Sequence, residues 1–106
     1  MKRHEASQLS FADIHEGDTF EVEHAFSQDE VERFAELSGD YSPLHVDPEY
    51  ASKTEFGQCV VHGMLLASLF SQLVGMRIPG MHALYLGQDL VFRRPVLVGE
   101  AVLAAA

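Results

Sequence analysis

The spacing of hydrophobic and polar positions changes along the chain, and each period predicts an element of secondary structure. Residues 19–25 alternate, with Phe20 and Val22 between polar neighbours, which predicts a half-buried strand. The same alternation predicts a second strand over residues 83–92 and the start of a third at 101–106. These three strands supply the β content of the predicted fold.

A helix is predicted over residues 28–38 because both of its ends carry signals. Ser27 is an N-cap residue and Glu30 follows three positions later, which makes a capping box. Gly39 is suited to the left-handed conformation that commonly ends a helix. Asp40 is therefore expected to emerge directly from a rigid element.

Two further helical segments are predicted. Residues 44–52 form one or two short turns, with Asp47 and Pro48 as the cap and first-turn pair. The longest helix covers residues 61–74, is apolar nearly all round, and is ended by Gly75 and by Pro79-Gly80. A helix of this kind is expected to be wrapped by other elements rather than laid on a surface.

Composition limits the classes of function. A chain of 106 residues fits one domain, and its net charge of -9 argues against a nucleic-acid partner. No apolar run reaches the roughly 18 residues that span a bilayer, and the N-terminus lacks the pattern of a signal peptide, so a cytoplasmic location is expected. The single Cys59 excludes an internal disulfide and is predicted to be a small buried hydrophobe.

The candidate chemistry lies in residues 39–63. Asp40 stands five residues before His45, with Pro43 stiffening the turn between them. A carboxylate and an imidazole on a rigid loop can share the activation of one water, and the helix start at His62-Gly63 offers backbone N–H groups to an oxyanion. Taken alone, each residue has a structural alternative: a solvated aspartate and a half-buried histidine. Together they favour an enzyme.

No metal site is predicted. His45 and Asp47 are close in the sequence and could bind a metal together with the more distant His62. No third ligand lies near the first two to support such a site. Asp47 is interpreted as a helix cap, and His62 is expected to fix the turn at the start of the long helix.

The segments GDYSPLHVDPEYA, VVHGMLLASLFSQLVG and YLGQDLVFRRPVLVGE resemble the MaoC-like (R)-specific enoyl-CoA hydratases over roughly residues 18–102. In bacteria these enzymes link fatty-acid oxidation to polyhydroxyalkanoate synthesis. The resemblance implies an α+β hot-dog fold, in which an antiparallel sheet wraps a long central helix, and a homodimer. It also implies reversible hydration of a trans-2-enoyl-CoA to an (R)-3-hydroxyacyl-CoA, with no cofactor, because coenzyme A is part of the substrate.

The resemblance assigns roles to individual residues. Asp40 matches the base that takes a proton from water, His45 matches the histidine that orients this water, and the Gly63 N–H would hold the thioester oxygen. Arg93-Arg94 would meet coenzyme A phosphates, although a charged strand end is an equally good interpretation. The remaining predicted site residues are two serines near the site, Ser42 and Ser71, and two apolar residues that would contact the acyl tail, Leu65 and Val74.

Two departures from the family pattern change the expectation. Ser42 stands at the usual asparagine, which predicts reduced rather than abolished activity. Family members continue beyond Gly99-Glu100, so we expect a single domain over 1–106, with an arm over 1–17, that lacks the final strands of the sheet or receives them from a partner chain.

Two other functions remain open. A hot-dog thioesterase would release free coenzyme A thiol, but the placement of Asp40 and His45 before the long helix favours a hydratase. A non-catalytic acyl-thioester binding or assembly protein would show saturable binding without turnover.

Overall fold

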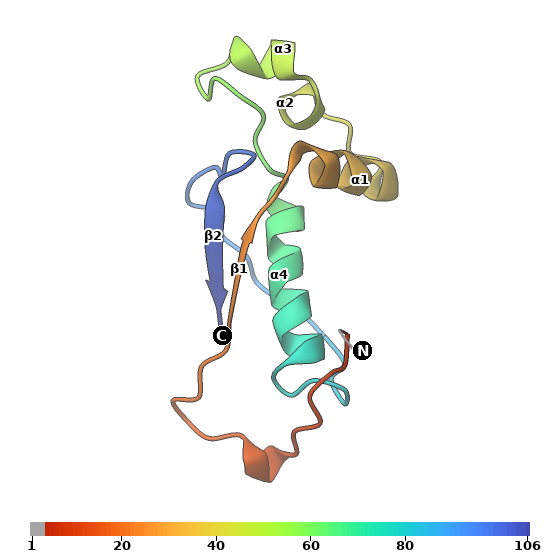
Figure 1. Ribbon diagram of the computed structural model, residues 1–106, viewed down its shortest axis with the longest axis vertical. Helices are drawn as coiled ribbons and strands as arrows, with labels where there is room; N and C mark the ends of the chain where they lie inside the picture. Colours follow the sequence, from red (N-terminus) through yellow and green to blue (C-terminus); the bar gives the residue numbers. More distant parts are fainter. Residues whose placement is uncertain (1–3) are drawn as a thin grey trace. The chain divides into compact units, whose positions relative to one another are not determined.

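The computed structural model describes residues 4–106, so the first three residues of the predicted N-terminal arm lie outside the described residues. The α-helices all lie between the two strands along the chain, as Figure 1 shows. The elements are, in order, the 3-10 turn η1 (Phe11–Asp13), β1 (Glu21–Ala25), α1 (Gln28–Ser38), α2 (Pro43–Val46), α3 (Pro48–Ser52), α4 (Gly63–Met76) and β2 (Ala101–Ala105).

Strands β1 and β2 pair with each other in a two-stranded sheet. Phe20 and Ala106, just beyond the two strands, exchange both backbone hydrogen bonds, at 2.7 and 2.8 Å, which is the pattern of an antiparallel pair. The predicted strands at 19–25 and 101–106 are therefore confirmed, with slightly shorter bounds.

The predicted strand over residues 83–92 is wrong. These residues form neither a helix nor a strand, and the sheet in the described part of the chain consists of β1 and β2 alone. Leu84 and Leu86, which alternation placed on one buried face, are 81% and 90% exposed. Alternation produces a strand only when a neighbouring strand takes up its backbone hydrogen bonds, and residues 83–92 have no such neighbour among the described residues.

Helix α4 begins two residues later and ends two residues later than the predicted 61–74, because it runs through Gly75 to Met76. It is also less enclosed than predicted. Leu65, Leu69 and Leu73 are buried at helical spacing, whereas Met64 is 62% exposed. No helix among residues 4–106 is long and apolar enough to cross a membrane.

The chain divides into two compact units. We call residues 24–66 and 91–102 the site unit, and the described residues among 1–23, 67–90 and 103–106 the terminal unit. Elements β1, β2 and α4 each contribute residues to both units. The predicted single domain over 1–106 stays a prediction.

In the terminal unit, the predicted arm is held by backbone hydrogen bonds. The Ser7 N–H donates to the Met76 carbonyl at 2.9 Å, and the Ser7 carbonyl accepts from the Met81 N–H at 2.7 Å. Gly80 has φ +89°, and a Cβ atom there would lie 2.2 Å from the Ser7 carbonyl oxygen. Only glycine fits this approach of the two segments.

In the site unit, the predicted helix signals are confirmed. Ser27 Oγ accepts from the Glu30 N–H, and Glu30 Oε1 accepts from the Ser27 N–H, so the capping box of α1 is complete. Gly39 ends α1 in the left-handed conformation at φ 82°. Asp47 caps α3 because its Oδ1 accepts from the Glu49 and Tyr50 N–H groups. These caps fix where α1 ends and where α3 begins, on either side of α2.

Candidate active site

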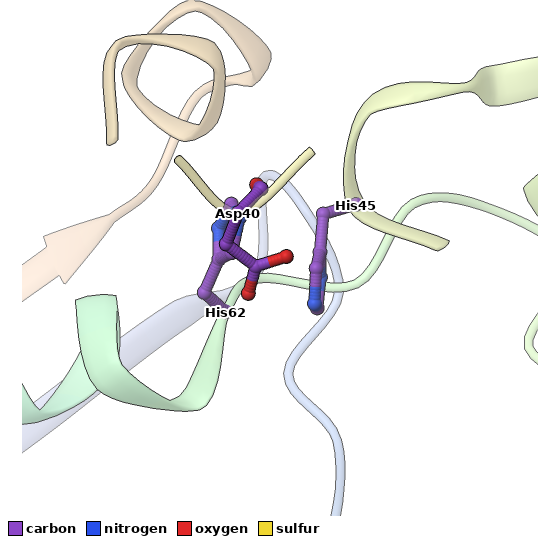
Figure 2. Close-up of side chains that lie close together, drawn as sticks. All are labelled: Asp40, His45 and His62. Atoms are coloured by element: carbon purple, nitrogen blue, oxygen red, sulfur yellow. The ribbon is translucent and has the colours of Figure 1, made fainter. Parts of the chain in front are cut away.

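Three side chains of the site unit meet at the end of α1, in α2 and before α4. Asp40, His45 and His62 place one polar atom each within 4.8 Å of one another (Figure 2). Asp40 is exposed, His45 is half-buried and His62 is buried. The structure thus brings the predicted pair of Asp40 and His45 together, and it adds His62.

The carboxylate of Asp40 is oriented by its own loop. Asp40 Oδ1 accepts a hydrogen bond from the Ser42 N–H at 3.1 Å, and the Asp40 N–H donates to Ser38 Oγ at 3.1 Å. The Ser42 carbonyl accepts from the His45 N–H at 2.9 Å, which connects this loop to α2. Backbone bonds of this kind hold a carboxylate at the end of a helix in one orientation.

The imidazole of His45 has its protonation fixed by a carbonyl. His45 Nδ1 lies 2.6 Å from the Val60 carbonyl oxygen. Because a carbonyl only accepts, Nδ1 carries the hydrogen, and the Nε2 atom of the neutral ring presents a lone pair. His45 can therefore accept a hydrogen bond or a proton at Nε2.

Residues 59–61 hold this carbonyl in place. The Val60 N–H donates to the Leu44 carbonyl at 3.1 Å, and the Val61 N–H donates to the Val96 carbonyl at 2.8 Å. The Cys59 carbonyl accepts from the Val98 N–H at 3.1 Å. The segment is thereby bonded to α2 on one side and to residues 96–98 on the other.

His62 lies against both predicted catalytic residues. Its Nε2–H donates to the backbone carbonyl of Asp40 at 3.0 Å. Its ring stacks on His45, with centroids 4.0 Å apart and an interplanar angle of 26°, and it meets the edge of Phe34 at 4.8 Å. Sequence reasoning gave His62 only a role in the turn before α4, and its contact with Asp40 was missed because the two residues are distant in sequence.

The cluster also bears on metal binding. Asp40, His45 and His62 each offer one ligand atom, and these atoms lie close enough together for a metal ion, so the predicted absence of a metal stays a prediction. Asp47, the third residue of the metal set considered from the sequence, caps α3 instead.

A cleft of about 320 Å³ opens beside His45. It brings together four predicted site residues: His45, Gly63, Arg93 and Arg94. Its other lining residues are apolar, namely Val60, Val61, Leu66, Phe92, Pro95 and Val96. A mostly apolar cleft with a few polar groups at one place is typical of a site for a small molecule.

Gly63 begins α4 at the edge of this cleft. The His62 carbonyl accepts from the Leu65 and Leu66 N–H groups, so Gly63 is the first helical residue. The N–H groups of a first helical turn have no acceptor within the helix, and the helix dipole places positive charge there. A developing oxyanion in the cleft would be stabilised by this helix start.

Leu65, Ser71 and Val74, which were also predicted to lie near the site, do not line the cleft beside His45. Leu65 lines a second cavity of about 230 Å³, with Phe26 and Phe34 among its neighbours, whereas Leu66 lines the cleft. Ser71 and Val74 belong to the terminal unit, so their predicted roles stay predictions. Leu66 was missed because an all-apolar helix does not reveal which of its faces meets a cleft. Phe92 was missed because it was assigned to the predicted strand over residues 83–92.

Comparison with known sequences gives a consistent result. The family profile described as MaoC like domain matches residues 10–106. An (R)-specific enoyl-CoA hydratase of Aeromonas caviae is 47% identical over 96 residues, which cover 91% of this chain and 72% of that protein. A mitochondrial 3-hydroxyacyl-acyl-carrier-protein dehydratase of Arabidopsis thaliana is 41% identical over 87 residues, which cover 82% of this chain and 51% of that protein.

Solved structures agree with this result. An (R)-hydratase from A. caviae involved in PHA biosynthesis matches with a TM-score of 0.85 and 48% identity, over 87% of this chain and 70% of that one. An R-hydratase from Pseudomonas aeruginosa matches with a TM-score of 0.90 and 33% identity, over 94% of this chain and 64% of that one. These likenesses confirm the predicted α+β hot-dog fold class, and the chain spans about half to seven-tenths of the lengths of these relatives.

Proposed function

The chain belongs to the MaoC-like domain family, and from this membership we propose that it catalyses the reversible (R)-specific hydration of a trans-2-enoyl thioester. The observation that carries the proposal is the meeting of Asp40 and His45 beside a cleft that Gly63 also lines. The product would be an (R)-3-hydroxyacyl thioester, and dehydration is the same reaction in reverse.

In the proposed reaction, Asp40 takes a proton from a water whose second contact is Nε2 of His45. The water oxygen bonds to Cβ of the substrate, and the π electrons move to the thioester oxygen. The Gly63 N–H stabilises the negative charge on that oxygen, and loss of one donor of this kind typically costs on the order of 100-fold in rate. The proton then passes to Cα on the same face, either from Asp40 or through His45, which leaves the enzyme unchanged.

The test is the loss of enoyl-thioester ultraviolet absorbance with crotonyl-CoA. We expect turnover by the native chain, and Asp40→Asn should abolish it because the amide accepts no proton. Asp47→Asn is the matched control: it keeps the cap of α3, so turnover should persist.

Other outcomes of this assay would overturn the proposal. The appearance of free coenzyme A thiol would identify a thioesterase. A folded chain with saturable binding of crotonyl-CoA but no loss of absorbance would identify a binding protein.

We further propose that Arg93 and Arg94 bind phosphate groups of the thioester carrier. Both line the cleft beside His45, and guanidinium groups match phosphate oxygens. Crotonyl-pantetheine lacks those phosphates, so the double variant R93Q/R94Q should raise the KM for crotonyl-CoA and leave the KM for crotonyl-pantetheine unchanged. Arg33→Gln is the control, because Arg33 pairs with Asp29 on α1. Equal effects on both substrates would contradict phosphate binding.

We also propose that the chain acts as a homodimer, as its relatives' family pattern implies. The exposed Leu84 and Leu86 support association, because large apolar side chains on a surface are typical of contact sites. Light scattering should give twice the chain mass, and Leu86→Glu should lower it. A monomeric mass at all concentrations would contradict the proposal.

A further inference from the structure

His62 is buried with an unused polar atom. Its side chain is 2% exposed, and its Nδ1 atom is buried and makes no hydrogen bond within the described part of the chain. A buried nitrogen without a partner is disfavoured, since an apolar ring would fill the same space without that cost. The presence of histidine here therefore calls for a reason other than packing.

The two contacts of His62 point to this reason. Its Nε2–H bonds the backbone carbonyl of Asp40, and its ring face lies on the ring of His45. One side chain thus touches both residues of the proposed reaction, although it does not line the cleft. Figure 2 shows the Asp40 carboxylate on the side where the His45 ring lies, with the His62 side chain overlapping Asp40 in this view.

The chemistry of the stacked rings is complementary. Carbonyl acceptors set both tautomers: Nδ1–H in His45 and Nε2–H in His62. Phe34 on the edge of His62 keeps that ring from rotating away.

We propose that His62 is a positioning residue for the reaction. It holds the backbone of Asp40 and the ring of His45 so that the Asp40 carboxylate and the His45 Nε2 atom contact the same water. This inference rests on the proposed function. It assigns His62 no contact with the substrate, so its loss should lower kcat and leave KM unchanged.

Two variants separate the contacts of His62. His62→Phe keeps a ring against His45 and removes the donor to Asp40, whereas His62→Gln keeps a donor and removes the ring. We expect His62→Phe to lower kcat about 100-fold, as misplacement of reacting groups by about 1 Å does, with KM within about twofold. His62→Gln should recover part of this loss, and His82→Gln, at an exposed histidine, should change neither constant. Unchanged kcat in both His62 variants, or a rise in KM alone, would overturn the inference.

A second measurement does not depend on activity. Imidazole ¹⁵N spectra should show Nε2–H in His62 and Nδ1–H in His45, and His62→Phe should shift both the His45 ring signals and the Ser42 amide, which bonds Asp40. An Nδ1–H tautomer in His62, or His45 and Ser42 signals unmoved by the substitution, would overturn the inference. A chain that gives these spectra without hydrating crotonyl-CoA would instead overturn the proposed function alone.

Discussion

A methyl group on Gly63 would lie 2.9 Å from the ring carbon Cζ of Phe92. Both residues line the cleft beside His45, and the clashing atom is the far end of a half-exposed side chain. Gly63→Ala should therefore leave the fold intact and push the Phe92 ring out of its place. We expect kcat/KM for crotonyl-CoA to fall about tenfold to 100-fold, because the helix start and the cleft wall are both displaced.

Gly75→Ala is the control for this change, because it lies in the same helix and a Cβ atom there meets nothing within 4 Å. Alanine in a helix interior is favoured over glycine by about 1 kcal/mol, so this variant should unfold at higher urea concentration with unaltered turnover. Full activity in Gly63→Ala would show that the contact with Phe92 does not matter to the site.

Ser42→Asn should raise the rate. Ser42 is exposed at the start of α2 and its hydroxyl makes no capping hydrogen bond, while its N–H holds the Asp40 carboxylate. Asparagine is as good an N-cap as serine, and its amide adds a donor and an acceptor near Asp40. One added hydrogen bond of about 1 kcal/mol corresponds to roughly a fivefold increase in kcat. A rate that stays the same or falls would refute this role for the position.

Cys59 should be unreactive until the site unit unfolds. The side chain is 4% exposed, which confirms the predicted buried hydrophobe, and burial raises the pKa of its thiol, with smaller contributions from Asp47 and Glu32. The thiolate is the reactive form. Labelling with a thiol reagent at pH 8 should be at least about 100-fold slower in buffer than in concentrated urea. Equal rates would mean that this unit is open in solution.

Glu30 should make stability depend on pH. The Ser27 N–H and, more weakly, His24 hold the pKa of Glu30 below its ordinary value of 4.5, although partial burial opposes them. Because the folded pKa is lowered, the ionised group stabilises the fold above pH 4.5, and this contribution is lost as pH falls through the lower folded value.

Glu30→Gln tests this dependence, because glutamine retains the capping-box geometry without the charge. Urea titration at pH 6 should show a loss of about 1 kcal/mol, and the difference should diminish in acid, as the pH falls below the lowered pKa of Glu30. A difference of the same size at both pH values would exclude the carboxylate as its source.

Helix boundaries were predictable where local chemistry decides them. Ser27, Glu30 and Gly39 gave the bounds of α1 correctly, because capping hydrogen bonds are made within a few residues of the helix end. Gly75 misled the prediction for α4, since glycine is tolerated inside a helix at a cost of only about 1 kcal/mol. The strand at 83–92 failed because its formation depends on a distant partner strand that local alternation does not reveal.

The candidate site was predictable in part for a similar reason. Asp40 directly follows α1 and His45 lies in α2 only five residues later, so their proximity follows from their short distance in the sequence. The contacts of His62 with Asp40, and of Phe92 with Gly63, join residues far apart in the chain. Such contacts depend on tertiary packing, for which the sequence of a single chain carries no direct signal.

The bonds of residues 59–61 also set an order of assembly during synthesis. The Val60 carbonyl that orients His45 belongs to a segment bonded to residues 96–98, which leave the ribosome long after Asp40 and His45. Helix α2, which carries His45, can form while the chain is still growing, but the segment of the Val60 carbonyl is bonded on both sides only when residues 96–98 arrive. The site is therefore complete only late in synthesis, even though Asp40 and His45 are synthesised early.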